Sequence, residues 1–203
     1  MSLFDTVWFP RFGDIPGVTY TTPSTVKLAR LKQRTMRPEQ TQYRDTPSML
    51  MWGSTSASPA NQHFRDEDAD ASIEGVLTNV AEALELPGIA SDYHFGIQGA
   101  IEWLYKRRHD TATVYDEVER LCWLDLQLIQ SQPQAVSMER DGKTQFFRVV
   151  AFQTLITVYS NEGALGDAVR VLDLARRFEQ AESSTAEKVR SRHVSVLAED
   201  EQP

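Results

Sequence analysis

The sequence contains one cysteine, Cys122, among 203 residues. A single thiol cannot form a disulfide within the chain, and it cannot supply the several sulfur ligands of a cysteine metal cluster. The histidines are also few and too scattered for the spacing of a metal site. We therefore expect no metal and no cofactor. The four histidines are His63, His94, His109 and His193.

Long hydrophobic runs are absent as well. The hydrophobic fraction of 41% and the charged fraction of 25% are those of an ordinary globular protein, and no apolar run approaches the length that crosses a membrane. The N-terminal stretch MSLFDTVWFPRFGDIPG has no basic start followed by an uninterrupted apolar segment, so it does not read as a secretory signal. We expect a cytoplasmic protein that does not bind membranes.

Positive charge is scarce after the first 50 residues. Residues 1–50 carry seven Lys and Arg against four Asp and Glu, a balance of +3, whereas residues 51–203 carry 14 against 25, a balance of -11. An acidic body repels nucleic acid and anionic lipid at long range, so we expect neither as the main partner. The basic segment 27–37 is interpreted as a short helix after Ser24. We favour a helix that is solvated or lies on the acidic body of a neighbouring copy; the alternative is a contact for nucleic acid or an acidic partner.

Proline is rare in most of the chain but frequent at its start, where six of the nine prolines precede residue 71. No helical or alternating period persists there, so residues 1–71 are predicted to form an extended, largely irregular N-terminal arm, with a flexible linker at residues 53–62. The arm carries two clusters of large apolar residues, which we interpret as anchors that bind either the chain's own helices or another subunit. The anchor residues are Phe4, Trp8, Phe9 and Phe12 in the first cluster, and Met49, Met51 and Trp52 in the second.

The rest of the chain is predicted to be helical, because apolar residues recur at steps of three and four. Residues 73–86 form a first helix, residues 91–133 a helical hairpin capped by Ser91 and Asp92, and residues 137–181 a last pair. A final helix starts at Ser184 and frays beyond Leu197. The fold class is therefore all-α, with a domain over residues 72–197 and a frayed tail over residues 198–203.

The last hairpin has the residue order of a known repeat. The order of residue types along it resembles the tetratricopeptide repeat. The residues that carry the resemblance are the large apolar Phe152, then Leu155, Tyr159, Gly163, Ala168, Leu172 and Ala175. The resemblance covers about one repeat, residues 148–181. It departs from the family pattern at Ile156, where a small residue is usual, and at Gln180, where a proline would close the second helix. It implies antiparallel helical hairpins stacked into a body whose groove binds polypeptide.

Catalytic motifs are sparse. Gly142, Lys143 and Thr144 reproduce the end of a phosphate-binding loop, but Ser137 stands at its first glycine and no buried strand precedes it. We favour an Asp-Gly turn at residues 141–142. Cys122 lies within an apolar stripe, which predicts a buried side chain and not a nucleophile.

Trp103 and Trp123 each lie one step beside an apolar stripe, so we expect them either to pack in the core or to line a groove between helix pairs. The resulting hypothesis is a non-enzymatic protein-protein interaction or assembly module that docks on a protein partner or on copies of itself. The alternative is a helical protein that binds a small ligand in a pocket lined by Trp103, His94, Tyr105 and Trp123.

Overall fold

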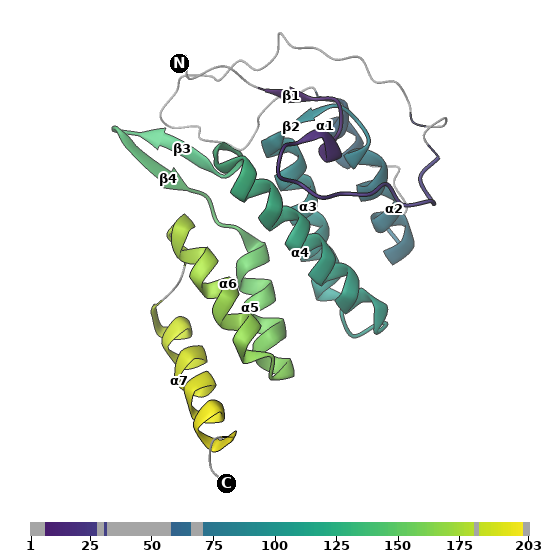
Figure 1. Cartoon of the computed structure of the whole chain (residues 1–203). Coiled ribbons are helices and arrows are strands. Elements are labelled where there is room, and N and C mark those ends of the chain that lie inside the picture. The colour runs from purple at the N-terminus through teal and green to yellow at the C-terminus, as the bar shows by residue number, and fades with distance from the viewer. Residues whose placement is uncertain (1–6, 28–30, 32–57, 66–70, 181–182, 201–203) are drawn as a thin grey trace. The chain divides into compact units, whose positions relative to one another are not determined.

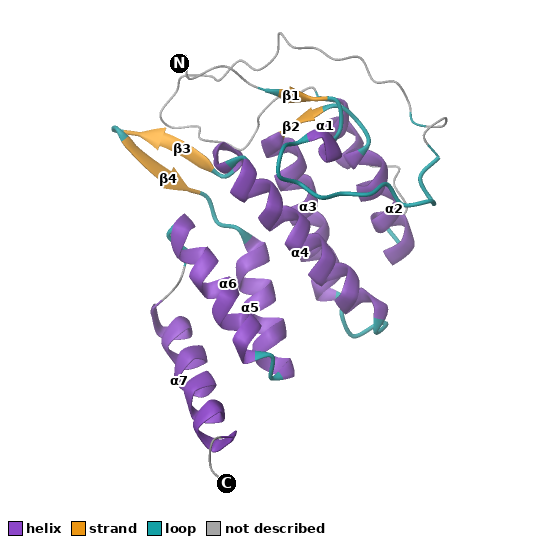
Figure 2. Ribbon diagram, viewed as in Figure 1, coloured by secondary structure: helices purple, strands orange, loops and turns teal. Residues whose placement is uncertain are grey.

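The computed structural model describes residues 7–27, 31, 58–65, 71–180 and 183–200. These residues are mostly helical, as the sequence predicts, with two small two-stranded sheets (Figures 1 and 2). The chain divides into two compact units, which we treat separately. Unit 1 comprises residues 1–100 and 127–135, and unit 2 comprises residues 101–126 and 136–203. In the part of the chain that is described, no helix is long and apolar enough to span a membrane.

Unit 1 contains short elements from the N-terminal segment together with longer helices. Strand β1 pairs antiparallel with strand β2, and the two lie side by side in Figure 1. Helix α3 begins in this unit and continues into unit 2, whereas α4 begins in unit 2 and ends here. The elements are β1 (Trp8–Phe9), η1 (Phe12–Asp14), α1 (Pro59–Phe64), α2 (Ile73–Leu84), β2 (Gly88–Ile89), α3 (Ala90–Lys106), α4 (Thr113–Ser131) and η4 (Pro133–Ala135).

The N-terminal segment supplies part of the core of unit 1. Phe9, Phe12, Ile15 and Val26 are buried. The ring of Phe12 packs edge-on against Tyr20 and Tyr93, with centroid distances of 5.6 and 5.5 Å. The predicted arm is therefore not irregular throughout: it contains β1, η1 and α1. These elements are two to six residues long, too short to produce a recognisable period in the sequence.

Helix α1 lies where the sequence predicts a flexible linker, so that prediction is wrong for residues 58–62. Ser58 caps the helix by accepting a hydrogen bond from the backbone N–H of Asn61 at 3.0 Å, and Pro59 occupies its first turn. Asp92, buried at the start of α3, accepts hydrogen bonds from Ser58 Oγ at 2.5 Å and from Asn61 Nδ2 at 3.1 Å. Ser91 and Asp92 do not cap α3, because α3 begins at Ala90; the carboxylate of Asp92 instead attaches α1 to α3.

Unit 2 contains the end of α3 and most of α4, then a β-hairpin, and then a row of antiparallel helices that lie side by side in Figure 1. Asp141 and Gly142 both have positive φ, 52° and 72°, as a two-residue hairpin turn requires, which confirms the predicted Asp-Gly turn. The helical pair expected over residues 137–181 therefore begins only at residue 150. The elements that follow α4 in this unit are β3 (Ser137–Arg140), β4 (Lys143–Phe146), α5 (Val150–Glu162), α6 (Leu165–Ala175), η5 (Arg176–Phe178) and α7 (Ser183–Asp200).

Helices α5 and α6 form a hairpin that turns at Gly163, where the sequence predicts the turn. Gly163 ends α5 with a left-handed φ of 82°, a conformation that glycine adopts without the clash a Cβ would cause. Beyond α6, Phe178 packs against Phe146 and Phe152. The side chain of Gln180 accepts a hydrogen bond from the Val149 N–H at 2.7 Å and donates one to the Phe147 carbonyl. This glutamine thereby links the end of the hairpin to the start of α5.

Candidate functional site

The predicted partner-binding residues differ in whether the structure describes them and in how far they are buried. Phe4, Met49, Met51 and Trp52 lie outside the described residues. Phe9 and Phe12 contact the chain's own core, so they are not available to a partner while that core is intact. Trp8 is half-buried in β1, and Trp103 and Trp123 are half-buried in unit 2. The two tryptophans of unit 2 are therefore the residues from which a candidate site can be built.

Trp103 lies in the last turn of α3, where an arginine covers it. The guanidinium carbon of Arg107 is 3.6 Å from the centroid of the Trp103 ring. Arg107 directly follows α3 and comes four residues after Trp103, so its side chain lies on the same side of the helix end. Arg107 Nη1 also donates a hydrogen bond to the Trp103 carbonyl at 3.3 Å. The arginine thus binds both the ring and one of the carbonyls that a helix leaves unbonded at its C-terminal end.

A second arginine repeats this arrangement one residue later. Arg108 lies 4.3 Å from the ring centroid of Tyr105 and donates to the Tyr105 carbonyl at 2.9 Å. Trp103 and Tyr105 are two residues apart, which separates them by about 200° around the helix. The two arginine-aromatic pairs therefore lie on opposite flanks of α3, and these two rings do not line one enclosed pocket.

Exposed basic residues complete this end of α3. Lys106 and His109 are exposed, and the ring of His109 packs edge-on against Tyr115 at the start of α4, 6.4 Å between centroids. We call the four consecutive residues 106–109 the α3 basic cluster. It joins the helix end to the turn that leads into α4, and cations are favoured at this position because the C-terminal end of a helix dipole is negative.

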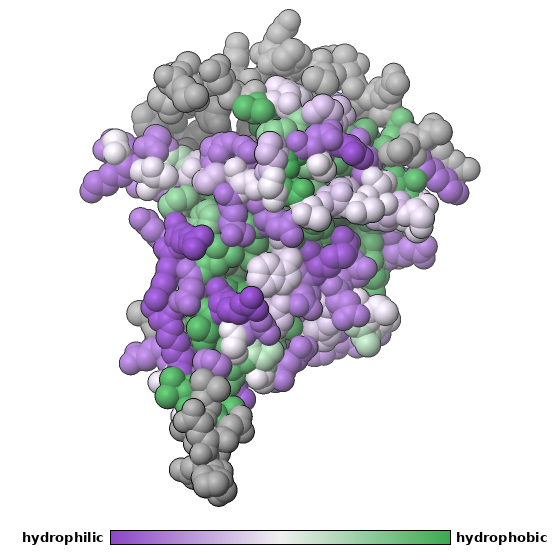
Figure 3. Space-filling model, viewed as in Figure 1, coloured by the Kyte–Doolittle hydropathy of each residue, from purple (hydrophilic) through white to green (hydrophobic). Residues whose placement is uncertain are grey.

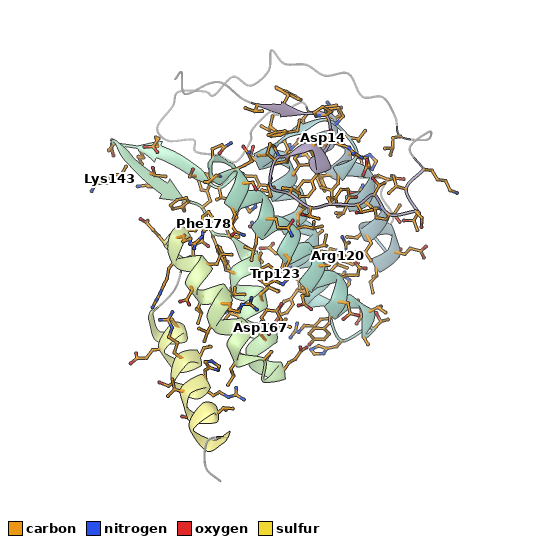
Figure 4. All side chains as sticks on the ribbon, in the orientation of Figure 1. Asp14, Arg120, Trp123, Lys143, Asp167 and Phe178 are labelled. Carbon is orange, nitrogen blue, oxygen red and sulfur yellow. The ribbon has the colours of Figure 1, made fainter. Side chains whose placement is uncertain are left out.

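Trp123 takes part in a hydrogen-bond chain that joins α4 to α5. Its Nε1 donates to the Tyr159 hydroxyl at 2.9 Å, and that hydroxyl donates to Glu119 Oε1 at 2.5 Å. Glu119 and Trp123 are four residues apart and lie on the same face of α4. In Figure 4, Trp123 lies on the side of α4 that faces α5 and α6. The indole N–H is therefore used within the chain, and this network fixes the position of the Trp123 ring.

The environment of Tyr159 raises its pKa to about 12. Burial of the phenol is the main cause, followed by its hydrogen bond to Glu119 and by the negative charges of Glu119 and Asp167; the hydrogen bond from Trp123 acts in the opposite direction. Because the pKa is higher in the folded than in the unfolded chain, the stabilisation from this group is complete below pH 10. It is lost as the pH rises from about 10 to about 12.

A spectrophotometric titration tests this network. The tyrosinate absorbance of the wild type minus that of Tyr159→Phe should have a midpoint near pH 12. Adding Glu119→Gln to both proteins should move the midpoint towards pH 10, because the negative charge beside the phenol is removed. A midpoint near pH 10 with Glu119 present, in protein whose circular dichroism remains helical, would contradict the proposed environment of Tyr159.

The end of α7 exposes apolar side chains. A Cβ placed on Gly166, in the first turn of α6, would lie 3.7 Å from His193 Cε1, so α7 reaches the beginning of α6 at His193. Val194 and Val196 follow, and they are 64% and 42% exposed. Hydrophobic surface is visible beside the grey atoms at the C-terminal end of the chain in Figure 3. Beside it runs a shallow groove lined mainly by α7, including Arg190 and Val194.

Other candidate chemistry is accounted for by packing. Cys122 is fully buried, as predicted, and burial together with the charges of Asp125 and Glu119 raises the pKa of its thiol. The thiolate that would act as a nucleophile is therefore disfavoured. Gly142 and Lys143, which resembled the end of a phosphate-binding loop, belong to the β-hairpin. Within the described ranges, no group of His, Cys, Asp and Glu side chains could hold a metal ion.

Arg107 and Arg108 were absent from the residues predicted to form a site. In the sequence, Arg107 and Arg108 belong to a run of basic residues at the end of a helix. Such runs are common, because the C-terminal end of a helix dipole is negative and favours cations. The spacing does contain a signal, because an aromatic residue three or four positions before an arginine lies on the same side of a helix. Whether the guanidinium stacks on the ring depends on side-chain conformation, which spacing does not determine.

Comparison with known protein families, curated proteins and solved structures finds no match to this chain.

Proposed function

We propose that this protein is a non-enzymatic interaction or assembly module that binds a polypeptide, on a partner or on another copy, at the end of α3. The observation that carries the proposal is the half-buried Trp103 ring beneath the Arg107 guanidinium. Trp, Tyr and Arg are the residue types enriched where interfaces concentrate their binding energy, and all three occur here within six residues, 103–108.

The geometry favours a polypeptide over an enclosed small ligand. Trp103 and Tyr105 lie on opposite flanks of α3, so a ligand that contacts both must extend around the helix end. A polypeptide segment can do so, whereas a small molecule would reach only one ring. We also propose, from the tetratricopeptide-like residues of α5 and α6, that the helical hairpins stack as repeats do, which would present the end of α3 beside a continuous helical surface.

Site-specific photo-crosslinking tests this function. A photoreactive residue at position 103 should crosslink a discrete polypeptide in cells, or a second copy of the chain, whereas the same residue at Gln153 should not. Gln153 is an exposed position on α5 of the same unit, so it serves as a matched control. Excess unlabelled wild-type protein should abolish the crosslink by competition.

Competition by unlabelled Trp103→Ala protein tests whether the Trp103 side chain itself contributes to binding. Truncation of an aromatic residue at the centre of an interface weakens binding by about 2 kcal/mol or more, roughly thirtyfold, so this variant should compete far less well than the wild type. Equal crosslinking at positions 103 and 153, or equal competition by both proteins, would show that the end of α3 does not bind a polypeptide.

A further inference from the structure

We infer that the α3 basic cluster recognises an acidic segment of its polypeptide partner, through the guanidinium groups of Arg107 and Arg108. This inference rests on the proposed function and specifies the chemistry of the partner. It starts from a contrast among the arginines of unit 2. In the described part of this unit, five of them form ion pairs with carboxylates: Arg120 with Glu117, Arg140 with Asp141, Arg170 with Asp167, and both Arg176 and Arg190 with Asp173.

Arg107 and Arg108 are held differently. Among the residues that the structure describes, neither forms an ion pair with a carboxylate; each is positioned by an aromatic ring and by one backbone carbonyl. A guanidinium has five N–H donors in a planar fork, and one hydrogen bond to the helix end leaves most of them for another acceptor. Stacking on a ring also restricts the side chain, so less rotamer entropy is lost when the fork binds.

Carboxylates are the acceptors that fit this arrangement in a polypeptide. The planar fork matches the two oxygens of a carboxylate, and charge-assisted hydrogen bonds of this kind are about twice as strong as neutral ones. Lys106 extends the positive potential along the same helix end. Because the two arginines lie on opposite flanks of α3, the segment must carry acidic residues at more than one position.

A short acidic peptide suits the charge of the chain better than nucleic acid does. The net charge of the chain is -8, which repels a long polyanion over its whole length. A short segment can contact Lys106, Arg107 and Arg108 without extending over the rest of the acidic chain. The interaction should therefore weaken steeply as salt is added, because the cluster is at the surface.

Peptide binding by charge-matched variants tests the inference. The full-length protein is titrated into a fluorescent poly-glutamate peptide, with a poly-lysine peptide and a single-stranded oligonucleotide as comparison probes. The double variant R107Q/R108Q should bind poly-glutamate at least about tenfold more weakly than the wild type, because it loses two charge-assisted contacts. The control R170Q/R176Q removes the same charge from α6 and η5 and should bind within about twofold of the wild type.

Three results would overturn the inference: no poly-glutamate binding by the wild type, equal losses in the two double variants, or tighter binding of the oligonucleotide than of the peptide. If R107Q/R108Q fails to fold by circular dichroism, R107K/R108K keeps both charges but lacks the planar fork, and binding equal to the wild type would count against the inference. A crosslink at position 103 that survives while poly-glutamate binding fails would refute the acidic partner and leave the proposed function standing.

Discussion

Replacing Phe12 with alanine is expected to lower the free energy of unfolding by about 3–5 kcal/mol. Phe12 is fully buried, and its ring packs edge-on against Tyr20 and Tyr93. Truncation removes the transfer free energy of the phenyl group and leaves a cavity that the surrounding rings fill only in part. Urea unfolding followed by circular dichroism measures the change as a shift of the midpoint at constant slope.

Val7 provides the matched control, since it lies in the same N-terminal segment but is 53% exposed. Val7→Ala should change the free energy of unfolding by less than about 0.5 kcal/mol. Similar effects of the two substitutions would mean that the N-terminal segment does not pack on unit 1 as the structure describes.

The burial of Phe12 changes how truncations should be designed. Removing residues 1–71 deletes Phe12, Ile15 and the whole of α1, all of which belong to unit 1. If such a truncated protein failed to bind a partner, unfolding of unit 1 would explain the result as well as the removal of a binding contact. Point substitutions at the end of α3 avoid this problem, because Trp103 and Arg107 are half-buried.

Asp92→Ala should destabilise the protein by about 3 kcal/mol. The buried carboxylate accepts hydrogen bonds from Ser58 Oγ and Asn61 Nδ2, and each bond to a charged group contributes about 1.5–3 kcal/mol. Its loss also leaves the Ser58 hydroxyl buried without its acceptor. Because this contact attaches α1 to α3, hydrogen exchange of the α1 amides should accelerate more than that of α5.

Asp167→Ala is the control for this substitution. Asp167 is exposed in the first turn of α6, where it pairs with Arg170, and its removal should cost less than about 1 kcal/mol. If Asp92→Ala is no more destabilising than Asp167→Ala, or if exchange in α1 is unchanged, the carboxylate of Asp92 does not hold α1.

The parts of the fold that the sequence predicted depend on local regularity. Helices α2, α4, α5 and α6 were located because their apolar residues recur at helical spacing over 11 to 19 residues. Gly163 and the Asp141-Gly142 turn were predicted because left-handed backbone favours these residue types. Such signals lie within a few neighbouring residues, so no tertiary information is needed to read them.

The candidate site was only partly predictable for the same reason. Trp103 and Trp123 were identified from their positions beside apolar stripes. The partner of Trp123 is Tyr159, 36 residues away, and nothing in the sequence relates the two before α4 and α5 are packed. The stacking of Arg107 on Trp103 is local in sequence, but it depends on which rotamers the helix end allows.

By itself, then, the sequence determined that this chain is mainly helical, where helices α2, α4 and α6 lie, and that Cys122 is a core residue. Only the tertiary structure decided that Phe9 and Phe12 are core residues, that Asp92 holds α1 and not the start of its own helix, and which arginines pair with carboxylates. The physical reason is the separation along the sequence of the residues that interact. Helical periodicity and turn geometry arise between near neighbours, whereas burial and hydrogen-bond partners arise between residues that only the folded chain brings together.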